Sequence, residues 1–91
     1  MQIITIDDAD FPPLLEAFKG GKVVGRYWNK GHVQVVRATS QFLLVSHGED
    51  PTKIALKPAR GISEAEDFAL RLLNRERARG NQVELTAPAP K

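Results

Sequence analysis

Cysteine is absent from the 91 residues, and so are long apolar runs. Without cysteine the chain has no disulfides, no thiolate zinc or iron–sulfur sites and no cysteine nucleophile, which favours a reducing compartment. No stretch is apolar over enough residues to cross a bilayer, and the first eight residues lack the basic flank and apolar core of a signal peptide. We therefore predict a cytoplasmic protein that contacts no membrane.

Aromatic residues are few, at 7%, and 13 Lys and Arg against 11 Asp and Glu leave a net charge of only +2. Hydrophobic residues at 42% and charged residues at 26% are typical of a folded domain. This length supports one core, so we predict a single domain over residues 1–86 and a disordered tail over 87–91.

The charge is unevenly distributed along the chain. Residues 1–18 carry four acids and no base, residues 19–61 carry eight bases and two acids, and residues 62–91 carry five of each. The middle of the chain is therefore where we expect an acidic partner to be attracted.

Turn residues divide the first two thirds of the chain into short segments. Residues 4–6 have the composition of a strand, and residues 13–19 that of a short helix that Gly20 and Gly21 end. Strand-like runs then follow at residues 23–28, 33–39, 42–47 and 53–57. The links between them are too short for parallel crossovers, so we predict an antiparallel meander.

A long helix over residues 63–79 is the clearest element. Ser63 and Glu66 have the spacing of a capping box, and Gly80 is placed to end the helix. At 100° per residue one apolar stripe faces the sheet: Ala65, Phe68, Ala69, Leu72 and Leu73. Val83 and Leu85 predict one more short strand. The fold class is α+β: an antiparallel β-meander of three to five strands with a long C-terminal helix packed on one face and a short N-terminal helix.

Hairpin register assigns the strand side chains to two faces. The loops suggest three pairs: Trp28 with His32, Thr39 with Phe42, and His47 with Thr52. We assign the long helix to the more aliphatic face, which includes Val24, Trp28, Val36, Ala38, Leu43, Val45, Ile54 and Leu56. The other face then displays the residues that we predict to bind a partner: Tyr27, Arg37, Phe42, Lys53 and Lys57.

Aromatic and basic side chains on an open sheet suit base stacking and phosphate neutralisation. One alternative is that Tyr27 and Phe42 pack under the short helix, against Leu14, Leu15 and Phe18. Another is that this apolar surface is a contact between copies of the chain.

Histidine is the main candidate for chemistry. Ser46 and His47 are neighbours on a strand and point to opposite faces, so they cannot form a nucleophile–base pair. His32 and His47 meet as diagonal neighbours with Gln34 between them, but catalytic zinc uses three protein ligands. Asp7, Asp8 and Asp10 could hold a hard cation such as magnesium, but acidic clusters beside prolines are more commonly turn formers and helix caps. We predict no catalytic residue, no metal and no cofactor.

The order of elements resembles the double-stranded-RNA-binding fold and the HicA-type ribonuclease toxins built on it. Gly31-His32 is similar to the toxin histidine, although the surrounding residues differ. Where such RNA-binding domains carry lysines at the start of the last helix, this chain has Glu64, Glu66 and Asp67. The resemblance covers element order only, and a shared fold does not assign function.

The leading hypothesis is a small non-catalytic binding module, regulatory or inhibitory, that docks its basic and aromatic sheet face on an acidic protein or nucleic acid. A net charge of +2 is low for a nucleic-acid-binding domain. One alternative is a homodimer with that face as its interface. Another is a very small ribonuclease that uses His32 or His47. The small size also suits a phage or plasmid protein that blocks a host factor.

Overall fold

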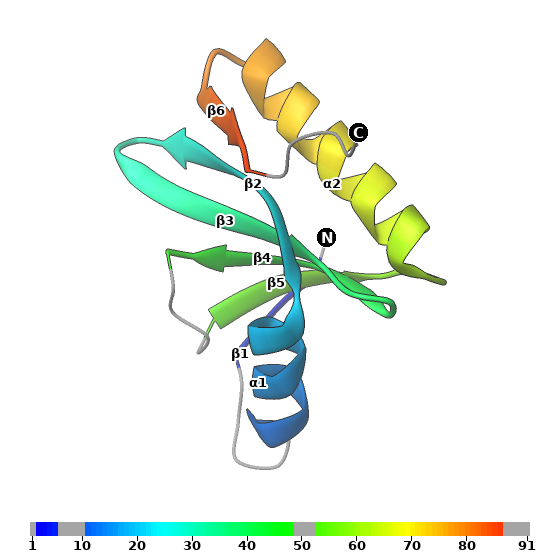
Figure 1. Cartoon of the computed structure of the whole chain (residues 1–91). Coiled ribbons are helices and arrows are strands. Elements are labelled where there is room, and N and C mark those ends of the chain that lie inside the picture. Colours follow the sequence, from blue (N-terminus) through cyan, green and yellow to red (C-terminus); the bar gives the residue numbers. More distant parts are fainter. Residues whose placement is uncertain (1, 6–10, 49–52, 87–91) are drawn as a thin grey trace.

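Short strands and two helices follow one another in the expected order. The computed structural model describes residues 2–5, 11–48 and 53–86 (Figure 1). The elements are β1 (Gln2–Thr5), α1 (Phe11–Gly20), β2 (Lys22–Asn29), β3 (His32–Ala38), β4 (Phe42–His47), β5 (Lys53–Pro58), α2 (Ile62–Ala78) and β6 (Gln82–Leu85). The predicted α+β class is confirmed. The acidic turn at 7–10 and the tail at 87–91 lie outside the described residues.

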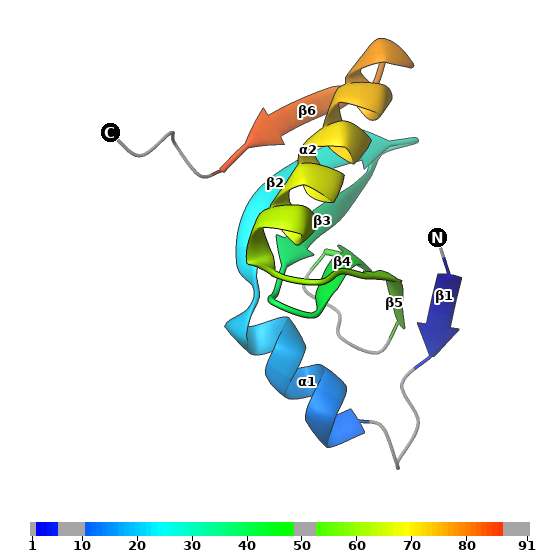
Figure 2. The ribbon, with the colours of Figure 1, turned by 90° about the vertical axis from the view of Figure 1, so that its right-hand side faces the viewer.

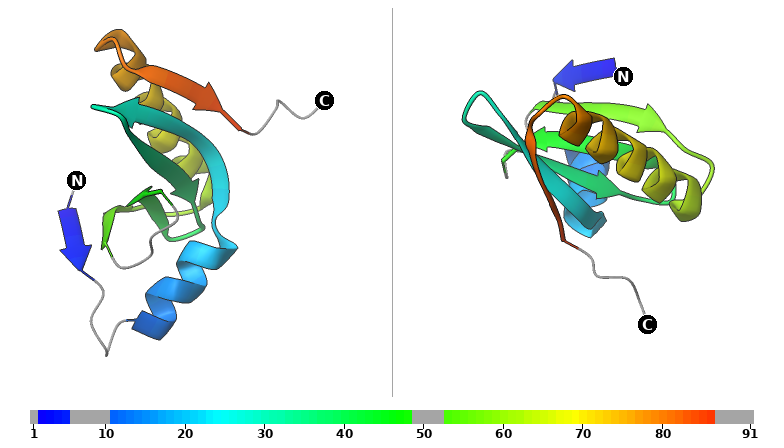
Figure 3. Two further views of the ribbon diagram at one scale, coloured as in Figure 1. Left: turned by 90° about the vertical axis from the view of Figure 1, so that its left-hand side faces the viewer. Right: turned by 90° about the horizontal axis from the view of Figure 1, so that it is seen from above.

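The six strands of the described residues form one antiparallel sheet in the order β1-β5-β4-β3-β2-β6. Strands β2 to β5 make the predicted meander, and β1 and β6 form its two edges. Helix α2 crosses one face of the sheet, and α1 lies below the sheet beside the start of β2 (Figures 2 and 3). Neither described helix is long and apolar enough to span a membrane.

The β2–β3 hairpin has a two-residue turn rather than the expected three-residue loop. Lys30 and Gly31 both have positive φ, 56° and 83°, as a type I′ turn requires. Asn29 therefore pairs with His32, and Trp28 with Val33. The predicted pairing of Trp28 with His32 is wrong by one residue, because Lys30 and Gly31 alone form the turn and Asn29 belongs to the paired strand.

The next hairpin follows the prediction. The Thr39 amide donates to the Phe42 carbonyl at 2.8 Å, and the Thr39 hydroxyl oxygen accepts from the Phe42 and Gln41 amides at 2.8 and 3.1 Å. These bonds close the Ser40-Gln41 link and satisfy the backbone groups of the turn.

The β4–β5 register differs from the prediction by one residue. Ser46 pairs with Ile54 and Leu43 with Lys57, so His47 does not pair with Thr52. Side chains of paired residues share a face of the sheet. Lys57 and Ala55 therefore share a face with Leu43, and the assignment of Ile54 to the α2 face is wrong.

A β-bulge in β2 changes the direction of its side chains partway along the strand. The register with β3 shifts between Val23 and Gly25. The extra residue lets both Val24 and Tyr27 pack in the cluster under α2, although they are three positions apart and would point to opposite faces of a regular strand. Val24 thus lies on the predicted face, whereas Tyr27 and Trp28 have exchanged faces.

Each face of the sheet carries its own apolar cluster. The cluster under α2 contains Val24, Val36, Ala38, Leu43, Val45, Ala65, Ala69, Leu72 and Leu73, with Phe68 and Tyr27 at its margin. This confirms the predicted apolar stripe of the helix. The cluster on the opposite face contains Phe18 of α1 with Leu44 and Ile54, and Phe42 packs against it. The two helices therefore contribute to opposite faces of one sheet.

The ends of α2 match the prediction at one terminus only. The N-cap is Gly61, without a side-chain cap, and Ser63 lies inside the first turn, so the predicted capping box is wrong. Glu64 instead accepts from the Arg60 amide at 2.7 Å. At the other end Gly80 has φ 94°, and its amide and that of Asn81 donate to carbonyls of the last turn, each at 3.0 Å. This is a Schellman motif, and it confirms Gly80 as the stop.

Candidate binding groove

The five residues predicted to bind a partner do not form a single patch. Arg37 pairs across the sheet with Leu44, which belongs to the Phe18 cluster, and Phe42 packs against that same cluster. Tyr27 and Lys57 lie on the α2 face. Lys53 begins β5 opposite Thr5, and its side chain lies outside the described residues.

Arg37 is a buried residue that connects the sheet to α1. The residue is only 7% exposed, and its guanidinium carbon lies 3.9 Å from the centroid of the Phe18 ring. Its Nη1 also donates to the hydroxyl of the buried Ser46 at 3.2 Å. A cation held against an aromatic ring and hydrogen-bonded inside the fold stabilises packing, so Arg37 is not presented on an open face.

The two aromatic residues have separate surroundings. Phe42 packs beside Phe18, as the alternative with the short helix predicted, and the side chains of Leu14 and Leu15 lie outside the described residues. Tyr27 packs under α2 instead. Burial, and secondarily the negative charge of Glu76, raise the pKa of the Tyr27 phenol, and the cations of Arg75 and Arg79 partly oppose this rise.

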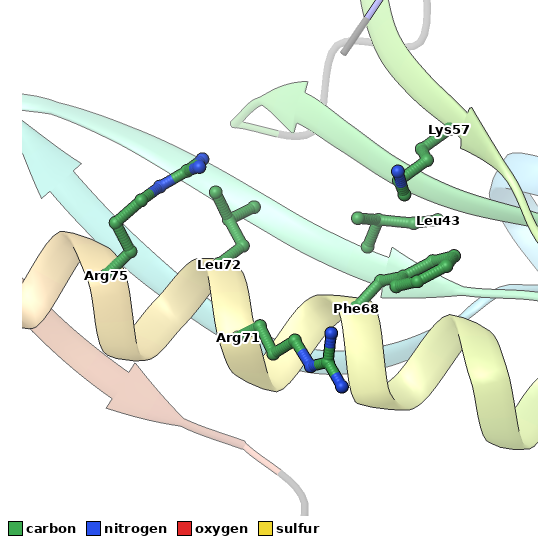
Figure 4. A pocket seen from close by; sticks show the side chains of 6 residues that line it. All are labelled: Leu43, Lys57, Phe68, Arg71, Leu72 and Arg75. Atoms are coloured by element: carbon green, nitrogen blue, oxygen red, sulfur yellow. The ribbon is translucent and has the colours of Figure 1, made fainter.

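A groove lies between α2 and strands β4 and β5 (Figure 4). It has a volume of about 360 Å³ and is lined by Leu43, Lys57, Phe68, Arg71, Leu72 and Arg75. Apolar side chains from the helix and from β4 form its floor, and the three basic side chains surround them. No acidic residue is among the described residues that line it. The groove therefore combines apolar contact with positive charge.

The three cations of the groove differ in how far they are already paired. Lys57 Nζ lies 4.6 Å from the centroid of the Phe68 ring. Arg71 Nε lies 3.0 Å from a carboxylate oxygen of Asp67, but both side chains are well exposed, and such a pair contributes little. Among the described residues, neither Lys57 nor Arg75 has an ion pair within 4.0 Å. Their charges are available to a ligand in the groove.

The sequence indicated only one residue of this groove as a binding residue. Lys57 was predicted, but on the opposite face, because the predicted β4–β5 register was wrong by one residue. Arg71 and Arg75, the other two basic residues of the lining, were not predicted to bind a partner. In the observed register Lys57 pairs with Leu43 and therefore lies on the α2 face of the sheet. There it lines the same groove as Arg71 and Arg75 of the helix.

His32 and His47 meet on the α2 side of the sheet, as predicted. Their ring centroids are 5.2 Å apart and their planes are inclined by 46°. Gln34, the cross-strand partner of His47, places its side-chain nitrogen 3.5 Å from His47 Nδ1. Ser46 is buried on the opposite face, so the predicted absence of a Ser46–His47 pair is confirmed. Among the described residues, no three or more His, Cys, Asp or Glu side chains are grouped so that they could hold a metal ion.

The chain matches no protein-family model, no curated protein and no solved structure.

Proposed function

We propose that this chain is a small binding module that holds an acidic, partly apolar segment of a partner protein in the groove between α2 and strands β4 and β5. By occupying that segment the module regulates or inhibits its partner. The single observation that supports this proposal is the ring of Lys57, Arg71 and Arg75 around an apolar floor, without an acidic residue in the described lining.

The composition of the groove matches the composition of such a segment. An apolar side chain of the partner would lie against Leu43 and Leu72, and carboxylates beside it would meet the surrounding cations. Arginine binds carboxylates through two parallel hydrogen bonds, which adds geometric selectivity to charge attraction. Arg71 and Arg75 are four residues apart on one helix, so their side chains are neighbours and can hold successive acidic groups.

A protein segment fits this groove better than a single-stranded nucleic acid does. Base stacking requires an aromatic ring with an open face, whereas the Phe68 ring in the lining already has the Lys57 ammonium over it. The net charge of +2 is also low for binding a phosphate backbone. The nucleic-acid version of the hypothesis becomes an outcome of the test.

The test is capture from a native lysate on the immobilised chain, with and without nuclease. Three forms are compared: the wild type, the double variant Lys57→Glu with Arg75→Glu, and the control Arg77→Glu. Arg77 is an exposed arginine of α2 outside the groove lining, so its reversal changes the net charge without altering the groove. Each captured protein is then produced alone, and its affinity for the three forms is measured by calorimetry.

We expect a protein that is captured after nuclease treatment, binds the wild type and the control alike, and binds the double variant at least about tenfold more weakly. Equal affinity for the double variant and the control would contradict the role of the groove. Loss of all capture on nuclease treatment would contradict a protein partner. The homodimer and ribonuclease hypotheses stay predictions, which light scattering and an RNA-cleavage assay test.

A further inference from the structure

The imidazole rings of His32 and His47 have the separation of two ligands on one metal ion. Zinc binds imidazole nitrogen at about 2.0–2.1 Å in tetrahedral geometry, which places the centroids of two ligating rings about 5 Å apart. The observed centroid separation is 5.2 Å. The ring planes are inclined by 46°, so the two rings are tilted and not stacked face to face. This arrangement leaves room for an ion between them.

We propose that His32 and His47 bind one divalent ion of the zinc, nickel or copper class at the exposed end of strands β3 and β4. This site lies apart from the groove and does not depend on the proposed function. It departs from the sequence-based expectation of no metal, which counted ligands without knowing their spacing. Imidazole nitrogen is a preferred donor for these three metals, whereas magnesium and calcium require oxygen ligands.

The backbone holds the two donors in place. Strands β3 and β4 are hydrogen-bonded neighbours, and the pairing of Gln34 with His47 fixes His32 as the diagonal neighbour of His47. The hydrogen bond from the Gly48 amide to the Val33 carbonyl, at 3.0 Å, extends the pairing to the end that carries both histidines. Donors on rigid, paired strands lose little conformational freedom when they chelate an ion.

Gln34 is placed to support His47 as a ligand. A histidine that binds metal through one ring nitrogen usually donates a hydrogen bond from the other. The side-chain amide of Gln34 lies 3.5 Å from His47 Nδ1. Rotation of this amide by half a turn presents its oxygen to Nδ1–H, which leaves Nε2 of His47 to bind the ion. The remaining coordination positions are open to water or to a further ligand.

The experiment is a titration of the purified chain with zinc chloride, read by the imidazole ¹⁵N signals and by calorimetry. The chain has two histidines and no cysteine, so every imidazole signal belongs to this pair. The variants are His32→Ala, His47→Ala and Gln34→Glu, with Asn74→Ala on the exposed side of α2 as the control. Both histidines are exposed, and circular dichroism checks that each variant is folded.

We expect zinc to shift one nitrogen signal of each ring, and each histidine variant to bind at least about tenfold more weakly, the loss typical of removing even an outer-shell partner. Gln34→Glu places a carboxylate beside His47 Nδ1 that accepts its hydrogen bond more strongly and should tighten binding, whereas Asn74→Ala should leave it unchanged. A zinc response confined to one ring, or equal affinity in the wild type and both histidine variants, would overturn the proposal.

Discussion

Replacing Gly25 by alanine should destabilise the protein, because the added methyl group has no room. Gly25 of β2 pairs with Leu85 of β6, and Leu73 of α2 packs over it. A Cβ atom at this position would lie 2.7 Å from the carbonyl oxygen of Glu84 and 2.8 Å from a methyl group of Leu73. The leucine methyl can rotate away, but the carbonyl belongs to the paired backbone of β6 and moves only if that strand shifts.

The magnitude follows from two opposing effects. Forcing an extra carbon into a packed core costs about 1–3 kcal/mol. Alanine also restricts the unfolded chain, which favours folding by about 0.4–1 kcal/mol. We therefore expect Gly25→Ala to lower the free energy of unfolding by roughly 1–2 kcal/mol. The matched control is Gly20→Ala at the end of α1, where a Cβ meets nothing within 4 Å and should be neutral or slightly stabilising.

Urea unfolding followed by the fluorescence of Trp28 measures both variants. Trp28 is the single tryptophan, and it pairs with Gln82 of β6, so it reports on the strand pair that the new methyl would disturb. Hydrogen exchange at the Thr86 amide, which donates to the Val24 carbonyl at 3.0 Å, gives a second local reading. An unfolding free energy within about 0.5 kcal/mol of the wild type, together with unchanged protection of Thr86, would refute the steric argument.

Three further predictions test other parts of the fold. Leu73→Ala should lower the free energy of unfolding by about 2–5 kcal/mol in urea titrations, whereas Leu70→Ala should change it by less than about 1 kcal/mol, because Leu73 is 0% exposed and Leu70 is 43% exposed. Gly80→Ala should cost about 1 kcal/mol in thermal unfolding, because alanine is strained at φ 94°. Tyr27 favours its neutral form in the folded protein, so its contribution to stability is present below the ordinary pKa of 10.0 and is lost as the pH rises through the raised value. Tyr27→Phe should therefore make the free energy of unfolding decline less steeply with pH above 10 than it does in the wild type; an identical decline would contradict the raised pKa.

The sequence predicted the elements well because their signals are local. Each strand in the meander is bounded by turn residues, and the predicted and observed limits of β4 coincide at Phe42–His47. The stop of α2 at Gly80 depends on one residue that tolerates a left-handed backbone, and that is readable from sequence. The start of α2 was wrong because Gly61 and Ser63 are both acceptable N-caps, and the local pattern does not distinguish them.

The candidate site was predicted less well, because membership of a sheet face depends on register. A shift of one residue exchanges the two faces of a strand. The turn at Lys30 and the longer link before β5 each introduced one such shift, which moved Tyr27 and Lys57 to the α2 face. The histidine pair was predicted correctly because the intervening β3–β4 link follows the expected register. The groove also depends on how α2 crosses the sheet (Figure 3), and no local sequence pattern predicts that crossing.

The positions of β1 and β6 at the two edges of the sheet also predict an order of folding. Strands β2 to β5 pair with their immediate neighbours in sequence, so they close short loops. Gln2 must instead find Leu56, and Leu85 must find Gly25, across most of the chain. Closing long loops costs more entropy, so both edge strands are expected to join last and to open first in the native state. The meander would then form first, and the pairing of β1 with β5 and of β6 with β2 would complete the sheet.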